Sequence, residues 1–143
     1  MAQIYIAGPL YTSSERLLLE HIDAVCKQKS FTTYLPHRDA GLFIADESST
    51  LPFFQRDRDE LDNVLLVIAV LNGSDIDSGT SWEMGYAYGN DKPIIGFLDD
   101  IRVYEPLKQL NLMITNSVTN VVNNLEQLAT ALDSLRNNTS GVA

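Results

Sequence analysis

The sequence predicts a single-domain α/β fold: a doubly wound (Rossmann-like or flavodoxin-like) parallel sheet of five strands with helices on both faces. Eight consecutive apolar residues, Val64–Leu71, are typical of a strand that is buried on both sides, as in parallel sheets. Strand-like and helix-like segments alternate along the whole chain, which favours a parallel sheet covered by helices. A length of 143 residues allows one hydrophobic core.

The first part of the chain predicts two strands and the helix between them. Gln3–Ala7 is a short apolar strand that ends at the turn Gly8–Pro9. Phe31–Leu35 is a second strand, followed by a proline. Ser13 or Ser14 can cap the intervening helix, because a serine hydroxyl accepts a hydrogen bond from a free amide of the first turn. The apolar face of this helix consists of Leu17, Leu18, His21, Ile22, Val25 and Cys26.

The middle of the chain predicts a long connection and three further elements. Residues 37–51 contain glycine, serine and mixed charges and are long for a connection in a compact domain, which indicates a substrate-facing loop or a mobile lid. Pro52–Asp62 is predicted as a polar helix and Thr80–Asn90 as the helix after the buried strand. Pro93–Leu98 is predicted as another buried strand.

The last elements close the sheet and the domain. Val121–Val122 is predicted as a short final strand, and Leu125–Leu135 has the leucine spacing of an amphipathic helix. We therefore expect a domain over residues 1–137 and a flexible tail over residues 138–143.

Composition and charge restrict the class of partner. The formal net charge is −9 and no run of lysine or arginine occurs, which argues against nucleic acid and anionic membranes as partners. A neutral small molecule fits this charge better. The single cysteine, Cys26, cannot form an internal disulfide and fits a reducing compartment. Because no apolar run approaches the roughly 18 residues of a membrane span and no leader-like segment follows Met1, we expect a soluble cytoplasmic protein.

Cofactor motifs are not found in the sequence. It has neither a GxGxxG fingerprint nor a phosphate-binding P-loop, and no His, Cys or Asp spacing that is typical of a metal site. We therefore expect no dinucleotide, no nucleoside triphosphate cofactor and no metal ion.

Three carboxylates are candidates for chemistry: Asp57, Asp77 and Glu83. In parallel α/β folds ligands bind beyond the carboxyl ends of the strands, and the segment Asp77–Ala87 follows the most apolar strand. Glu83 is expected in the first turn of the next helix, facing that crevice. A structural alternative stays open, since Thr80 and Glu83 have the spacing of a capping box. For Asp57 the alternative is a solvated helix charge.

At this point the sequence resembles the nucleoside 2-deoxyribosyltransferase family over nearly its whole length. The opening Ile4–Pro9 resembles the family's first strand and glycine turn, and Asp57 has the spacing of an acidic residue ahead of the buried strand. Asp77–Thr80 and Glu83–Ala87 resemble the central signature. Asn111–Met113 resembles a motif that family members present to a neighbouring subunit. One departure is Val64-Leu65, where many relatives have Ala-Asp, at a place that is not catalytic.

The resemblance implies a role for each site residue. Glu83 is the nucleophile, Tyr5 orients its carboxylate, and Asp57 exchanges a proton with the leaving and incoming bases. Asp77 holds the 5' end of the sugar, where a carboxylate accepts a hydrogen bond from a free hydroxyl and repels a phosphate. From the residues alone, Tyr5 could equally be one more aromatic side chain of a strand.

Further contacts to the substrate are expected around these residues. Tyr11 could stack on the base, or it could be an ordinary surface tyrosine. His37 and Asp39 follow the second strand and could bind base edges. The remaining expected contacts are Gly8 and Gly79, which permit close approach of the backbone, and Asn111 and Met113 of a neighbouring subunit, which makes the enzyme at least a dimer.

The implied function is exchange of the base of 2'-deoxynucleosides, with small-molecule nucleosides and free nucleobases as partners. The implied mechanism is a retaining double displacement through a covalent deoxyribosyl ester of Glu83. Two alternatives remain at this stage. One is an N-glycoside hydrolase of nucleosides or nucleotides with the same nucleophile. The other is a non-catalytic nucleotide-sensing module in which Glu83 is only a helix cap.

Overall fold

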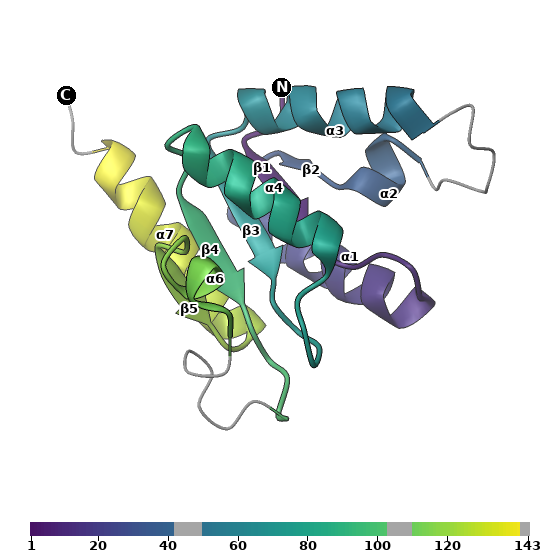
Figure 1. Cartoon of the computed structure of the whole chain (residues 1–143). Coiled ribbons are helices and arrows are strands. Elements are labelled where there is room, and N and C mark those ends of the chain that lie inside the picture. Colours follow the sequence, from purple (N-terminus) through teal and green to yellow (C-terminus); the bar gives the residue numbers. More distant parts are fainter. Residues whose placement is uncertain (42–49, 103–109, 141–143) are drawn as a thin grey trace.

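The computed structural model describes residues 1–41, 50–102 and 110–140 of the chain. Its centre is a five-stranded parallel sheet with the strand order β2-β1-β3-β4-β5 (Figure 1). The strands are β1 (Ile4–Ala7), β2 (Thr33–Tyr34), β3 (Leu66–Val70), β4 (Ile94–Phe97) and β5 (Asn120–Val122). The predicted doubly wound sheet is confirmed, and its strand order is that of flavodoxin-like folds.

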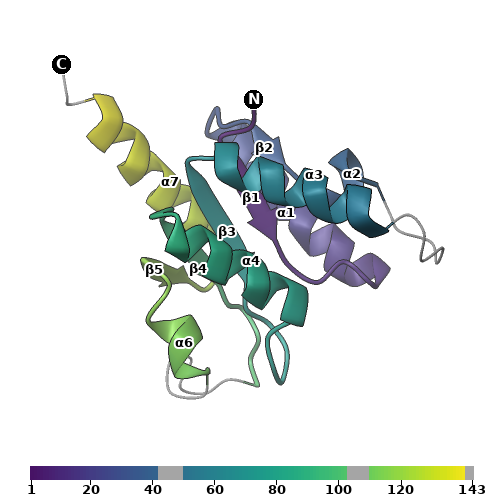
Figure 2. The ribbon, with the colours of Figure 1, turned by 45° about the horizontal axis from the view of Figure 1, so that its top comes forward.

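The longer helices cover both faces of the sheet (Figures 1 and 2). On one face α1 (Ser13–Gln28) packs beside α7 (Leu125–Ser140). On the other face α3 (Thr50–Asn63) packs beside α4 (Ser78–Gly89). Within the described ranges, no helix is long and apolar enough to cross a membrane.

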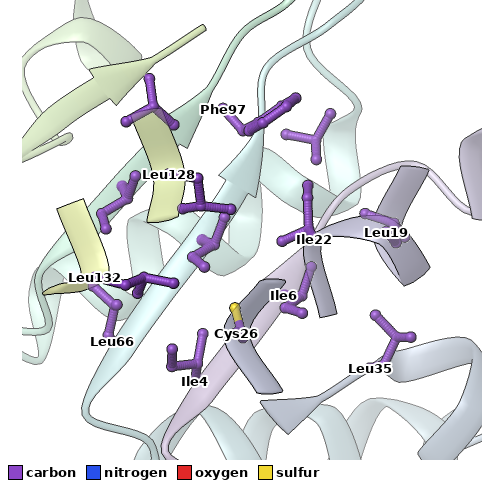
Figure 3. Close-up of a cluster of buried hydrophobic side chains, with 14 residues drawn as sticks. Ile4, Ile6, Leu19, Ile22, Cys26, Leu35, Leu66, Phe97, Leu128 and Leu132 are labelled. Atoms are coloured by element: carbon purple, nitrogen blue, oxygen red, sulfur yellow. The ribbon is translucent and has the colours of Figure 1, made fainter. Parts of the chain in front are cut away.

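The side chains of β1 alternate between two hydrophobic cores. Ile4 and Ile6 point toward α1 and α7, where they join a buried cluster that includes Cys26 (Figure 3). Tyr5 and Ala7 point toward α3 and α4. Burial of an isoleucine side chain contributes about 1.5–3 kcal/mol, so this alternation holds the strand firmly in register. Tyr5 is thereby fixed on the α3–α4 face of the sheet.

The first helix begins one residue earlier than predicted. Its N-cap is Thr12, whose Oγ1 accepts a hydrogen bond from the backbone N–H of Glu15 at 3.1 Å. Glu15 in turn accepts from the Thr12 N–H at 3.0 Å, which completes a capping box. Ser13 and Ser14 are therefore inside the helix, and the prediction that one of them is the cap was wrong.

The apolar runs were longer than the buried elements that they form. Val64–Leu71 forms a strand only over Leu66–Val70, and Leu65 is exposed. The buried face of α1 contains Leu19, whereas Leu17 is exposed. In both cases the sequence identified the element, and its packing set the ends and the exact face.

One predicted connection and the predicted tail are partly helical. The short helix α2 (Pro36–Asp39) lies in the predicted loop 37–51, and α3 begins at Thr50. Residues 42–49 lie outside the described residues, so the proposed lid stays a prediction. The last helix continues to Ser140, which is inside the segment expected to be a tail; residues 141–143 are again outside the description.

The strand order puts a topological switch point between the carboxyl ends of β1 and β3, the place where ligands bind in folds of this type. The chain leaves β1 toward β2 and leaves β3 toward β4, so the two connections diverge at this point. Gly8 follows β1 at this switch point. A Cβ atom on Gly8 would lie 2.7 Å from Leu19 Cδ2 and 3.1 Å from Val70 Cβ. Close packing of α1 and β3 is therefore sufficient to require this glycine, and its contact with a substrate stays a prediction.

Candidate active site

Two tyrosines and two carboxylates meet on the α3–α4 face of the sheet. The hydroxyl of Tyr5 donates a hydrogen bond to Glu83 Oε1 at 3.0 Å. The hydroxyl of Tyr34 donates to Asp57 Oδ1 at 2.7 Å. The two tyrosine rings stack with their centroids 5.3 Å apart and an angle of 27° between their planes. We call these four residues the tyrosine–carboxylate cluster.

Strand register and helix packing bring the cluster together. Tyr5 of β1 and Tyr34 of β2 are paired in the parallel ladder, so their side chains lie side by side on one face. Asp57 comes from α3 and Glu83 from α4, the two helices that pack over this face. Four segments that are distant in sequence therefore contribute one side chain each.

Burial controls the protonation of both carboxylates. It raises the pKa of Glu83 to about 8, and the negative charges of Asp57 and Asp77 act in the same direction. The hydrogen bond from Tyr5 opposes this by stabilising the ionised form. Burial also raises the pKa of Asp57, while the Tyr34 hydroxyl and the charge of Arg56 lower it. Because the two carboxylates influence each other, their protons leave in two steps that belong to the pair.

The tyrosine hydroxyls remain hydrogen-bond donors throughout. Burial, together with the neighbouring carboxylates, raises the pKa of Tyr5 and of Tyr34 well above the ordinary value. Each phenol therefore keeps its proton and presents it to one carboxylate.

Glu83 is not a helix cap. The N-cap of α4 is Asp77, whose Oδ2 accepts hydrogen bonds from the N–H and the Oγ1 of Thr80, both at 2.9 Å. Glu83 lies in the second turn, so its predicted first-turn position was wrong, and its carboxylate contacts Tyr5 instead of the Thr80 backbone. The capping-box alternative is thereby excluded.

Asp77 and Tyr11 lie at the same end of the site as Glu83. The charge of Asp77 is the largest cause that raises the pKa of Tyr11, and Glu83 contributes as well. The Tyr11 side chain is 73% exposed, so its ring is accessible to a ligand.

A cavity of about 270 Å³ lies between α3 and α4 and is bordered by both carboxylates of the cluster. Its lining residues are Phe54, Asp57, Arg58, Leu61, Gly79, Trp82 and Glu83. Phe54 and Trp82 meet edge to face at 5.3 Å, and Trp82 stacks on Tyr86 at 5.2 Å. Of these lining residues, Asp57, Gly79 and Glu83 were predicted from the sequence. The aromatic walls were missed, although Trp82 directly precedes the predicted nucleophile.

The structure does not bring His37 and Asp39 into the tyrosine–carboxylate cluster. His37 lies in α2 with its Nε2 3.2 Å from Glu20 Oε1 of α1. Asp39 accepts a hydrogen bond from the backbone N–H of Leu35 and pairs with Arg38. Their contact with a base stays a prediction, and both side chains have a local polar partner.

Figure 2 shows α6 (Leu112–Thr115) and α3 on opposite sides of α4, and the cavity that Glu83 lines is the one on the α3 side. Asn111 is the N-cap of the short helix α6, where its Oδ1 accepts from the Met113 N–H at 2.9 Å. A cavity of about 400 Å³ separates α6 from α4, and the Met113 side chain is 71% exposed. Within one chain, the Asn111–Met113 motif therefore does not line the cavity beside Glu83.

The described part of the chain contains no group of three or more His, Cys, Asp or Glu side chains placed to hold a metal ion. The tyrosine–carboxylate cluster itself offers two carboxylates and two phenols. A carboxylate suits nucleophilic or proton-transfer roles, and a second carboxylate of different pKa can take the complementary role.

Fold and site together define the class: a flavodoxin-like α/β enzyme with two tyrosine-bound carboxylates at a cavity between α3 and α4. The model of the family described as nucleoside 2-deoxyribosyltransferase matches residues 4–133. The chain therefore belongs to the nucleoside 2-deoxyribosyltransferase family. This confirms the resemblance seen in the sequence motifs. No curated protein sequence matches the chain significantly.

Solved structures share the fold over nearly the whole chain. A conserved protein from Enterococcus faecalis V583 has a TM-score of 0.76 at 23% identity, covering 94% of this chain and 98% of that one. The 2-deoxyribosyltransferase from Bacillus psychrosaccharolyticus has a TM-score of 0.74 at 22% identity, with coverages of 92% and 96%. A 2-desoxiribosyltransferase from Leishmania mexicana has a TM-score of 0.69 at 20% identity, covering 93% of this chain and 98% of that one.

Proposed function

We propose that this enzyme exchanges the base of 2'-deoxynucleosides by a retaining double displacement with Glu83 as nucleophile. The observation that carries the proposal is the Glu83 carboxylate, which Tyr5 holds at a cavity that Asp57 also borders. Family membership supports the same chemistry. The reaction takes place on small molecules, deoxynucleosides and free bases, and we place it in the cytoplasm and in nucleotide salvage.

In the first displacement, a Glu83 carboxylate oxygen attacks C1' of the deoxyribose. The bond from C1' to the base nitrogen breaks, and its electron pair takes the proton of Asp57. The product is a deoxyribosyl ester of Glu83. In the second displacement, a nitrogen of the incoming base attacks C1', its proton passes to Asp57, and the ester bond breaks to regenerate the Glu83 carboxylate.

Asp77 is our candidate for recognition of the sugar. A carboxylate accepts a hydrogen bond from a free 5'-hydroxyl and repels a 5'-phosphate, so we expect nucleosides to be preferred over nucleotides. The exposed ring of Tyr11 lies near Asp77, which fits the proposed stacking on a ligand at this end of the site.

We also propose that the enzyme is a homo-oligomer in which Asn111 and Met113 complete the site of a neighbouring subunit. Two observations support this. The motif lies away from Glu83 in its own chain, and α6 exposes the apolar side chains of Leu112 and Met113. Exposed apolar groups of this kind are typical of interaction surfaces.

The test is a base-exchange assay with 2'-deoxyinosine as donor and adenine as acceptor. We expect 2'-deoxyadenosine from the wild-type enzyme and a rate lower by roughly a thousandfold from Glu83→Gln. Glu126→Gln, an exposed carboxylate on α7, is the matched control and keeps the wild-type rate. A 2'-fluorinated donor should slow the second displacement, so that the ester on Glu83 becomes visible by mass spectrometry.

The same assay separates transfer from hydrolysis. The ester can also react with water, and the structurally similar proteins include a CMP N-glycosidase from Clostridium botulinum, with a TM-score of 0.58 at 22% identity and coverages of 93% and 98%. Free deoxyribose formed at the same rate with and without adenine would show a hydrolase. Failure to form either product from any deoxynucleoside would reject the proposed function.

A further inference from the structure

Tyr34 belongs to none of the motifs that predicted the site, yet it contacts the second carboxylate directly. It lies on β2, a strand of two residues, and its side chain is 6% exposed. Its hydroxyl donates to Asp57 Oδ1 at 2.7 Å, which is the usual distance of a well-formed O–H···O hydrogen bond.

The position of Tyr34 is itself fixed by two contacts. The backbone of β2 pairs with β1, with Tyr34 beside Tyr5. The Tyr34 ring stacks on the Tyr5 ring, whose hydroxyl holds Glu83. The donors of both carboxylates are therefore parts of one rigid unit, since stacked and buried aromatic rings lose little freedom. The spacing between Asp57 and Glu83 depends on this unit.

We propose that Tyr34 is a positioning residue that holds the Asp57 carboxyl in the orientation from which it exchanges a proton with the base. This rests on the proposed function, because it takes Asp57 as the proton donor. Asp57 lies in the charged middle part of α3, and the adjacent Arg58 donates to Asp59. The Tyr34 hydroxyl is the contact that aims the Asp57 side chain toward the sheet. Small misplacements of a catalytic group are costly, so this contact affects the rate.

The chain offers a matched control for this hydrogen bond. Tyr86 of α4 donates to Asp62 Oδ1 of α3, also at 2.7 Å, so it joins the same two residue types at the same distance. Asp62 is exposed and neither Tyr86 nor Asp62 lines the cavity beside Glu83. Tyr34→Phe and Tyr86→Phe therefore each remove one tyrosine–aspartate hydrogen bond, one inside the site and one outside it.

The test has two readouts, both on the full chain. Titration of ¹³C-labelled aspartate carboxyls by NMR needs no substrate and measures the pKa of Asp57. Removal of a donor that stabilises the ionised form should raise this pKa by about one unit in Tyr34→Phe. The acid limb of the pH profile of kcat/KM, which follows the carboxyl that ionises first, should move to higher pH by the same amount. Tyr86→Phe should change neither.

The positioning role of Tyr34 and the base-exchange activity can fail independently of each other. If Tyr34→Phe changes the pKa of Asp57 and the acid limb of kcat/KM no more than Tyr86→Phe does, the positioning role of Tyr34 is overturned. The proposal of base exchange is not affected by that result. If no base exchange occurs at all, the NMR titration still decides whether Tyr34 controls Asp57. Phenylalanine keeps the stacking on Tyr5, so the variant is expected to fold.

Discussion

At the scale of single residues, two opposing effects set the pKa of Glu83 at about 8: burial raises this pKa, and the Tyr5 hydrogen bond lowers it. Tyr5→Phe removes the second effect, so the pKa of Glu83 should rise by about one further unit. Asp57 and Glu83 together then lose their last proton at a higher pH, so the basic limb of the pH profile of kcat/KM should move to higher pH. The plateau should fall roughly tenfold, because the proton resides less often on Asp57. A pH profile against wild type checks this; an unmoved basic limb contradicts it.

Ionisation of the buried Glu83 carboxyl should also lower the free energy of unfolding. Its folded pKa lies above the ordinary 4.5, so the folded protein binds this proton more tightly than the unfolded chain does. The resulting stability is complete below pH 4.5 and is lost as pH rises through about 8. Glu83→Gln carries no charge to be buried, so it should be more stable than wild type by roughly 4 kcal/mol at pH 8, but by no more than about 1 kcal/mol at pH 5. Urea unfolding at both pH values measures the difference, and a constant offset would refute the cause.

Single residues also show where sequence interpretation stops. Asp57, Asp77 and Glu83 could be predicted because their spacing resembles a family signature. Tyr34 could not, because a tyrosine in a two-residue strand carries no pattern, and only the ladder reveals its place beside Tyr5. The Tyr5 role was proposed from resemblance, and the hydrogen bond to Glu83 supplies its physical basis.

At the scale of secondary structure, Asp77 has two roles that can be separated. It caps α4 through Thr80, and we propose that it also recognises the 5'-hydroxyl. Asp77→Ser keeps a capping hydroxyl but removes the charge, so stability should change little while discrimination against 5'-nucleotides weakens. Asp77→Ala loses the cap as well and should cost about 1 kcal/mol. Unfolding curves and kcat/KM for a nucleoside and its 5'-phosphate check this. Unchanged discrimination in both variants would remove Asp77 from substrate recognition.

The elements were predicted from their apolar patterns, and their ends were not. Burial on both faces makes a central strand such as β3 visible as an apolar run, whereas a helix start depends on one hydrogen bond among several polar candidates. Thr12 was passed over for Ser13 and Ser14 in this way. The same uncertainty gave Glu83 a possible capping role, because the capping box was read with Thr80 as the N-cap. The N-cap is Asp77, three residues before Thr80.

At the scale of the whole molecule, the sheet order was predictable in class, since alternating elements favour a doubly wound sheet with a crevice at the switch point. The location of Asn111 relative to Glu83 was not predictable from one chain. The motif and the nucleophile lie on different sides of α4, so a site that uses both needs two subunits. A site shared between two subunits can be restored when two inactive variants mix, whereas a site within one chain cannot.

Two inactive variants should restore activity when their subunits mix. A hybrid of Glu83→Gln and Asn111→Ala subunits has one site with both changes and one site with neither. Random mixing into dimers makes half of them hybrids, so about a quarter of the wild-type activity should return after co-expression. The control is Glu83→Gln mixed with Asp57→Ala, because both residues belong to one chain's cluster and every hybrid site keeps a defect. Recovery in the first mixture alone supports a shared site, and no recovery in exchanged, folded oligomers places the whole site within one chain.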